Sequence, residues 1–146
     1  MALSTIREEL LGHHNEIRRL CTETLGAVER ARRAESGAHA ALRSSVLRLV
    51  DTIQAHNARE DELLIRLLPT FDAWGVERTR RMCEHHLRED ADSIAALASS
   101  SRPGDDRHVA AILDDVLEHM ALEEQEFLRA DVLDDDTYDT DAAFGG

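Results

Sequence analysis

The sequence contains no lysine and only five aromatic residues, two prolines and two cysteines among its 146 residues. Cys21 and Cys83 are too few for a disulfide framework and form no Cys-x-x-Cys pair, so we expect a reducing, cytoplasmic setting. Long apolar runs are also lacking, and the first eleven residues already carry Arg7, Glu8 and Glu9. We therefore expect neither a membrane-spanning helix nor a secretory signal. Scarce proline and aromatic residues, with abundant Ala, Leu, Arg and Glu, favour helix.

Acidic residues outnumber basic ones by 30 to 17, which gives a formal net charge of -13. A chain with this excess repels phosphate groups, so we expect no nucleic-acid partner. Residues 131–146 contain six Asp and no basic residue. We expect this segment to be an acidic, disordered tail, whose protein partner is unknown, and residues 1–130 to form one domain.

Apolar residues recur at spacings of three and four along four segments of the chain. The segments are residues 5–33, residues 42–67, which end before Pro69, residues 77–98 and residues 107–130. Short connections join these segments, and helices of comparable length joined in this way pack next to their sequence neighbours. The pattern therefore predicts an all-α fold, an antiparallel up-down-up-down four-helix bundle.

Polar residues interrupt each apolar stripe near the middle of its helix. The interruptions are His14 in the first helix, His56 and Glu60 in the second, His86 and Asp90 in the third, and His119 and Glu123 in the fourth. A His and an acid four residues apart converge on one side of a helix, as two ligands of one metal centre would. His85 with Glu89 has the same spacing but lies one step off its stripe, and His13 is less well phased than His14.

A single histidine on an apolar face is more often a hydrogen-bonded core residue than a metal ligand, and a single buried acid more often pairs with Arg. Here the arginines do not lie on the stripes. Several unpaired carboxylates buried at one level would be very costly, and a pair of metal ions would supply the missing positive charge. Mixed nitrogen and oxygen donors favour iron, with manganese or zinc as alternatives. A metal-free helical interaction module with an acidic tail is the competing interpretation.

Three segments, HHNEIRRL, HNAREDELLIRLLP and HMALEEQEFL, resemble the hemerythrin-like family, whose members carry the HHE cation-binding domain. The resemblance covers about residues 3–130. Ferritin-like di-iron bundles use Glu-x-x-His pairs, whereas this chain uses His-x-x-x-Glu. The resemblance implies a non-haem di-iron protein that binds or reacts with O2, peroxide or NO, in sensing, scavenging or storage. An oxidoreductase that decomposes peroxide is the alternative.

The same resemblance implies two iron ions bridged by carboxylates and by hydroxide or oxide. It implies that Glu60 and Glu123 bridge the two irons. It implies that His14 and His56 bind the iron that keeps an open position, and that His86 and His119 bind the other iron. Oxygen-carrying members have a second histidine on the third helix where this chain has Asp90. An additional anionic ligand stabilises ferric iron, so we expect easier oxidation and poorer oxygen release than in a carrier.

Overall fold

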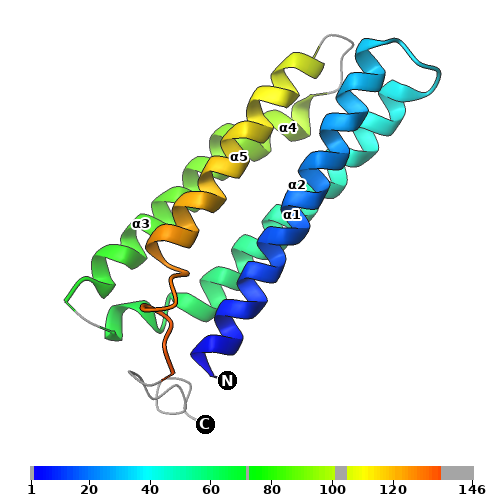
Figure 1. The fold of residues 1–146 in the computed structure, drawn as a ribbon. Helices are drawn as coiled ribbons and strands as arrows, with labels where there is room; N and C mark the ends of the chain where they lie inside the picture. Colours follow the sequence, from blue (N-terminus) through cyan, green and yellow to red (C-terminus); the bar gives the residue numbers. More distant parts are fainter. Residues whose placement is uncertain (1, 72, 101–104, 136–146) are drawn as a thin grey trace.

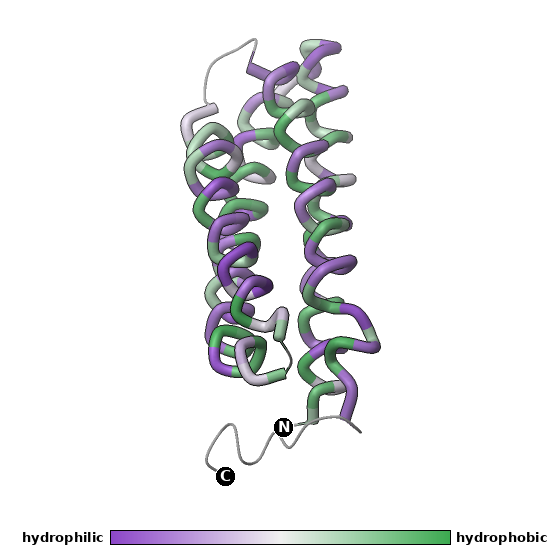
Figure 2. The backbone as a smooth tube through the Cα atoms, turned by 90° about the vertical axis from the view of Figure 1, so that its left-hand side faces the viewer, coloured by the Kyte–Doolittle hydropathy of each residue, from purple (hydrophilic) through white to green (hydrophobic). Residues whose placement is uncertain are grey.

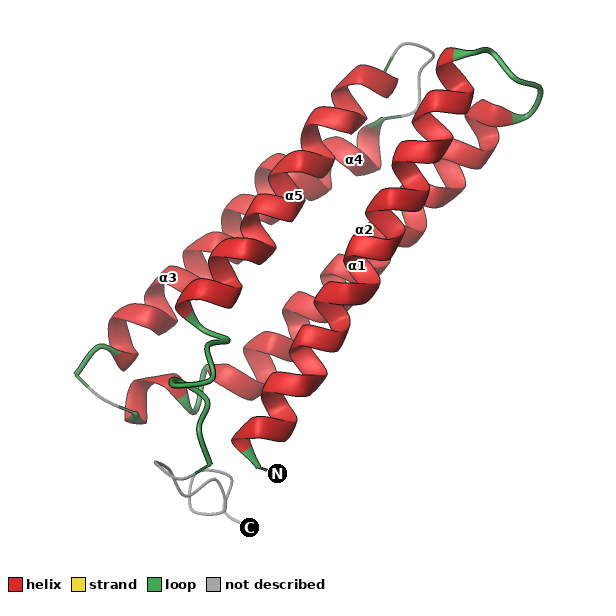
Figure 3. Ribbon diagram, viewed as in Figure 1, coloured by secondary structure: helices red, strands yellow, loops and turns green. Residues whose placement is uncertain are grey.

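The computed structural model describes residues 2–71, 73–100 and 105–135. Its elements are α1 (Leu3–Arg32), α2 (Ala38–Leu64), the 3-10 turn η1 (Leu68–Thr70), α3 (Gly75–Arg88), the π-helical turn η2 (Glu89–Ile94), α4 (Ala95–Ser99) and α5 (Asp106–Glu126). No described residue lies in a β-strand, as Figure 3 shows. The all-helical class predicted from the sequence is therefore confirmed.

The helices form four rods, because α3, η2 and α4 follow one another without a break and stay helical through both junctions. The rod α1 contacts α2 and α5, and the α3–η2–α4 rod contacts α2 and α5 in turn. Figure 1 shows these rods side by side, with hydrophobic and hydrophilic residues alternating along each of them in Figure 2. The four apolar stripes therefore face a shared interior. Within the described part of the chain, every helix is too short or too polar to cross a membrane.

Two helices end earlier than their apolar periodicity predicts. The helix α2 ends at Leu64, and Pro69 lies in η1. Proline has no backbone N–H to continue an α-helix. The helix α5 ends at Glu126, where the carbonyl oxygen of Glu123 accepts hydrogen bonds from the backbone N–H groups of both Phe127 and Leu128. Both of these residues are buried, so the chain folds back over this end of the bundle.

Glycine is required where α3 begins. A Cβ atom on Gly75 would lie 1.8 Å from the carbonyl oxygen of Leu68, a separation that no side chain tolerates. The backbone of η1 and the start of α3 therefore pack in direct contact. This contact fixes where the third rod begins relative to the end of α2.

The structure differs from the expected disordered tail over residues 131–135. Leu133 is buried in the core. The backbone N–H and the hydroxyl of Ser4 donate to the two carboxylate oxygens of Asp135, at 3.0 and 2.6 Å. The segment is ordered because these contacts attach it to the start of α1. The rest of the expected tail, residues 136–146, lies outside the described residues.

Two apolar clusters fill the interior, one toward each end of the bundle. On α1, Leu10 belongs to one cluster and Ile17 to the other, and the buried His14 lies between them. On α2, Ile53 and Leu63 flank a buried polar stretch in the same way. The fold therefore places a polar level between two dry apolar regions.

Candidate metal centre

Five polar side chains, contributed by all four rods, meet at the polar level. They are His14 from α1, His56 and Glu60 from α2, His86 from α3 and Glu123 from α5, and we call them the His/Glu cluster. His14 and Glu60 are fully buried, and no member is more than 5% exposed. Such burial is strongly unfavourable for charged groups unless opposite charges and hydrogen bonds compensate it.

Each carboxylate of the cluster divides its two oxygens between imidazoles on opposite sides. Glu60 Oε2 lies 3.1 Å from His56 Nε2, and Glu60 Oε1 lies 3.1 Å from His86 Nε2. Glu123 Oε2 lies 3.0 Å from His14 Nε2, and Glu123 Oε1 lies 3.3 Å from His86 Nε2. A carboxylate placed between two sets of donors in this way is suited to bridge two metal ions.

The three imidazoles of the cluster also share an orientation, with Nε2 facing the carboxylates and Nδ1 facing a polar partner outside. The Nδ1 pairs are His14 with Glu124 Oε1 at 3.3 Å, His86 with Asp61 Oδ1 at 2.8 Å, and His56 with His13 Nδ1 at 3.2 Å. Arg18 donates to both oxygens of Glu124 and so holds it in place. A partner on Nδ1 fixes the ring and the tautomer that leaves Nε2 free to bind a metal.

Four ligand atoms of the cluster are close enough to share one ion. One atom from each of His14, His56, Glu60 and Glu123 lies within 4.8 Å of all the others. His14 Nε2 is only 3.1 Å from His56 Nε2, and no described residue makes a well-oriented hydrogen bond to the buried Glu60 Oε2. Facing lone pairs and a buried oxygen without a donor are unfavourable unless a cation lies among them. The donor set therefore fits a metal ion.

The electrostatics of the cluster favour positive charge. Burial disfavours the charged imidazoles, but hydrogen bonds to Glu123 and Glu60 outweigh it and raise the pKa of His56 to about 9. The same opposing causes raise the pKa of His86 to about 11. The three imidazoles hold the pKa of Glu123 well below its usual range in spite of its burial. Protons or metal ions can supply this charge, and the two compete for the same lone pairs.

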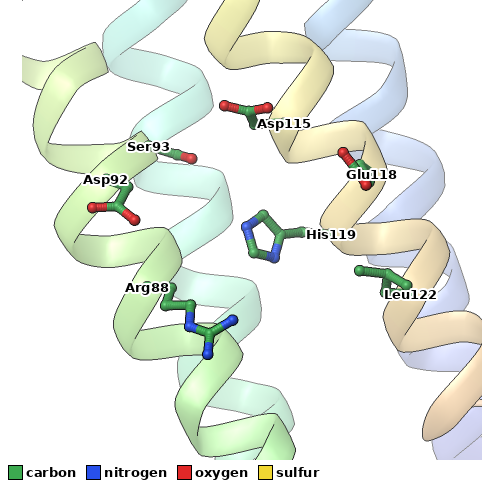
Figure 4. Close-up of a pocket in the computed structure, with 7 residues that line it drawn as sticks. All are labelled: Arg88, Asp92, Ser93, Asp115, Glu118, His119 and Leu122. Carbon is green, nitrogen blue, oxygen red and sulfur yellow. The ribbon is translucent and has the colours of Figure 1, made fainter.

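The structure leaves His119 out of the group of converging ligand atoms. This residue lies one turn before Glu123 on α5, and its Nδ1 is buried without a partner among the described residues. The Nδ1 of His85 is in the same situation, and the two rings lie 5.8 Å apart between centroids. Figure 4 shows His119 reaching from α5 toward Arg88 and Ser93, into a pocket of about 250 Å³. Two unused imidazole donors therefore lie on the third and fourth rods, near the His86 part of the cluster.

The third rod buries a different carboxylate from the predicted one. Asp90 is exposed, whereas Glu89 is only 4% exposed and accepts a hydrogen bond from Asn57 Nδ2 at 2.8 Å. The π-helical turn η2 begins at Glu89, directly after the α-helical residues of α3. Steps of three and of four residues both stay on one face of an α-helix, so the spacing from His86 allows either Glu89 or Asp90 to face inward. The predicted inward position of Asp90 is therefore corrected to Glu89.

Sequence reasoning missed the residues that hold the imidazoles from outside. Asp61 and Glu124 are only partly buried and lie off the apolar stripes. A signal for them was present, because each directly follows a carboxylate of the cluster: Glu60 precedes Asp61, and Glu123 precedes Glu124. Two consecutive acids that begin four residues after a histidine could have indicated a ligand, the first acid, and an outer hydrogen-bond partner, the second.

Comparison with known proteins gives one match. The family model described as the hemerythrin HHE cation binding domain matches residues 5–130, which is most of the chain. No curated protein and no solved structure matches. The matched range contains every member of the His/Glu cluster together with His85, Glu89 and His119.

Proposed function

Because the chain belongs to the hemerythrin HHE cation-binding domain family, we propose that it is a dinuclear iron protein that binds or reacts with O2, peroxide or NO. One observation carries this proposal: two buried carboxylates each face imidazole nitrogens with both of their oxygens. A single ion needs only one oxygen from each carboxylate. Two ions, one on either side of the carboxylates, would use all four.

We assign the ligands by the sides of the carboxylates that they face. One ion would be held by His14 and His56 together with Glu60 and Glu123. The other would be held by His86, which faces both carboxylates, with His119 as the remaining donor. The mixed nitrogen and oxygen set suits iron. Bound ferrous iron would supply electrons and an open coordination position for a small ligand.

The chain's own residues would protect this chemistry from water. Ile17, Ile53 and Met120 are buried in the apolar cluster on one side of the His/Glu cluster, and Leu10 and Leu63 are buried on the other. A dry surrounding strengthens electrostatic interactions inside the site and limits side reactions. We also propose that the four rods alternate in direction, because few residues separate successive rods in the sequence.

Metal analysis of the purified protein tests the proposal most directly. We expect about two iron ions per chain and near-ultraviolet absorption of a ferric centre. The variant His56→Ala is expected to lose about half of the bound iron, because it removes one of the four converging ligand atoms that would hold one of the two ions. His108→Ala is the matched control, since His108 is exposed on α5. A folded, colourless, metal-free protein would support the metal-free interaction module instead.

Ligand binding and turnover require a separate measurement. We expect the iron-loaded protein to change its absorption spectrum when NO or O2 is added. Steady evolution of O2 from added peroxide would identify a peroxide-decomposing oxidoreductase, whereas a single stoichiometric reaction would identify a binding or sensing module. The Glu60→Gln protein is the blank for both assays, because Glu60 faces both sides of the cluster and adventitious iron in solution would still react in its presence.

A further inference from the structure

Glu89 is a buried carboxylate that the ligand assignment above leaves unused. It lies on the third rod, three residues after His86, at the first position of the π-helical turn. Its side chain is almost completely buried, and its hydrogen-bond partner among the described residues is neutral, namely Asn57. Burial is unfavourable for a carboxylate, and no arginine in the described part of the chain pairs with this one. A carboxylate in this position therefore needs another explanation.

The partner of Glu89 places it at the level of the His/Glu cluster. Asn57 directly follows His56 on α2 and lies three residues before Glu60. The chain also places Glu89 one turn after His86, and its hydrogen bond reaches the residue that follows His56, so Glu89 lies beside the cluster between α2 and the third rod. Burial raises the pKa of Glu89 to about 7, although the hydrogen bond from Asn57 acts in the opposite direction.

The hydrogen bonding around Glu89 also argues against a purely structural role. Asn57 donates from Nδ2 to Glu89, but Asn57 Oδ1 is buried with no hydrogen-bond partner among the described residues. A glutamine at position 89 would accept from Nδ2 and donate to Oδ1, which would satisfy both groups without a buried charge. Local stability alone would therefore favour an amide here. Departures from local stability of this kind are expected at functional sites.

We propose that Glu89 is a third carboxylate ligand of the metal centre, on the His86 side, placed there by its position one turn after His86 on the third rod. This inference rests on the proposed function. Two ferrous ions bring four positive charges, and Glu60, Glu123 and Glu89 together bring three negative charges. The additional anionic ligand stabilises ferric over ferrous iron. The centre is thereby tuned for oxidation rather than for reversible release of O2.

Co2+ titration of Glu89→Gln tests this assignment, with Asp90→Asn as the matched control on the exposed neighbouring acid. For the Gln variant we expect the first, more tightly bound Co2+ to keep its affinity. The affinity for the second Co2+ should fall by about tenfold or more. We also expect a higher reduction potential in the iron-loaded protein. The control should match the unsubstituted protein in both measurements.

Thermal unfolding without metal separates a ligand from a structural residue. Glu89→Gln, and a second variant Glu89→Met, should be at least as stable as the unsubstituted protein when metal is absent. A structural role predicts loss of stability in both variants, and that result would overturn the inference. The inference would also be overturned if either folded variant bound the second Co2+ as tightly as the unsubstituted protein does. It would likewise be overturned if Asp90→Asn, and not the Glu89 variants, weakened binding of the second Co2+. If the unsubstituted protein takes up no Co2+, the proposed function itself fails.

Discussion

The uninterrupted helices and the interrupted third rod contribute to the same centre in different ways. In α2, His56 and Glu60 are four residues apart on a regular helix, and both are buried in the His/Glu cluster. In the third rod, His86 lies near the end of α3 and Glu89 begins the π-helical turn. In α2 only one acid lies three or four residues after the histidine, whereas in the third rod Glu89 and Asp90 both do, and the structure buries only Glu89. π turns are frequent at functional sites.

The two sides of the centre also differ in how completely their donors converge. His14 and His56 meet the carboxylates in a group of four atoms within 4.8 Å. On the other side, only His86 contacts both carboxylates, and the Nδ1 atoms of His85 and His119 are buried without partners in the described part of the chain. We therefore expect the His14 side to bind its ion more tightly.

The largest effect is expected where the two sides share a residue. Glu60→Gln removes a carboxylate whose oxygens face both His56 and His86. Both ions should bind more than about 100-fold more weakly, a larger loss than removal of an outer hydrogen-bond partner causes. Co2+ titration measures this, and Glu62→Gln, on the exposed face of the same helix, is the control. Two tight ions in Glu60→Gln would show that Glu60 does not bridge.

Much of the centre could be predicted because it obeys the periodicity of its helices. His14, His56 and Glu123 lie in phase with apolar residues that pack in the core, so their burial follows from spacing alone. The order of the helices and the all-helical class follow from the same pattern. The family likewise could be recognised, since its model matches residues 5–130.

The remaining features depend on contacts that no spacing encodes. The burial of Glu89 in place of Asp90 depends on a contact with the amide of Asn57 on another helix. The order of residues 131–135 depends on a hydrogen bond between Ser4 and Asp135, far apart in sequence. His119 lies in phase with its helix, yet its ring reaches toward a pocket beside the third rod. Side-chain rotamers and long-range partners set all three.

A smaller effect is expected when only one side of the centre is changed. His14→Ala should remove the tighter ion, because it leaves three of the four converging atoms. His119→Ala should leave that ion in place and weaken only the second one, by about tenfold or more. Stoichiometry and stepwise affinities from Co2+ titration distinguish the two variants. Equal losses of both ions in His119→Ala would contradict the difference between the sides.

The smallest effect is expected outside the ligands, at the partner that holds His86. Asp61 Oδ1 lies 2.8 Å from His86 Nδ1, although the Asp61 side chain is 39% exposed. Asp61→Ala should weaken the second ion by only about tenfold, because the imidazole loses the acceptor that fixes its tautomer and raises its basicity. The metal-free protein should lose little stability, since a half-exposed ion pair contributes little.

The neighbouring variant Glu62→Ala provides the control for Asp61→Ala. Glu62 is 69% exposed and pairs only with Arg59 in the described part of the chain, at 3.2 Å. It should leave both ions unchanged. Glu124→Ala gives the matching test on the other side, because Glu124 holds His14 as Asp61 holds His86. Glu124→Ala should weaken binding of the tighter ion and not of the second. If Asp61→Ala and Glu124→Ala weakened binding of the same ion, the two outer partners would not act on separate sides.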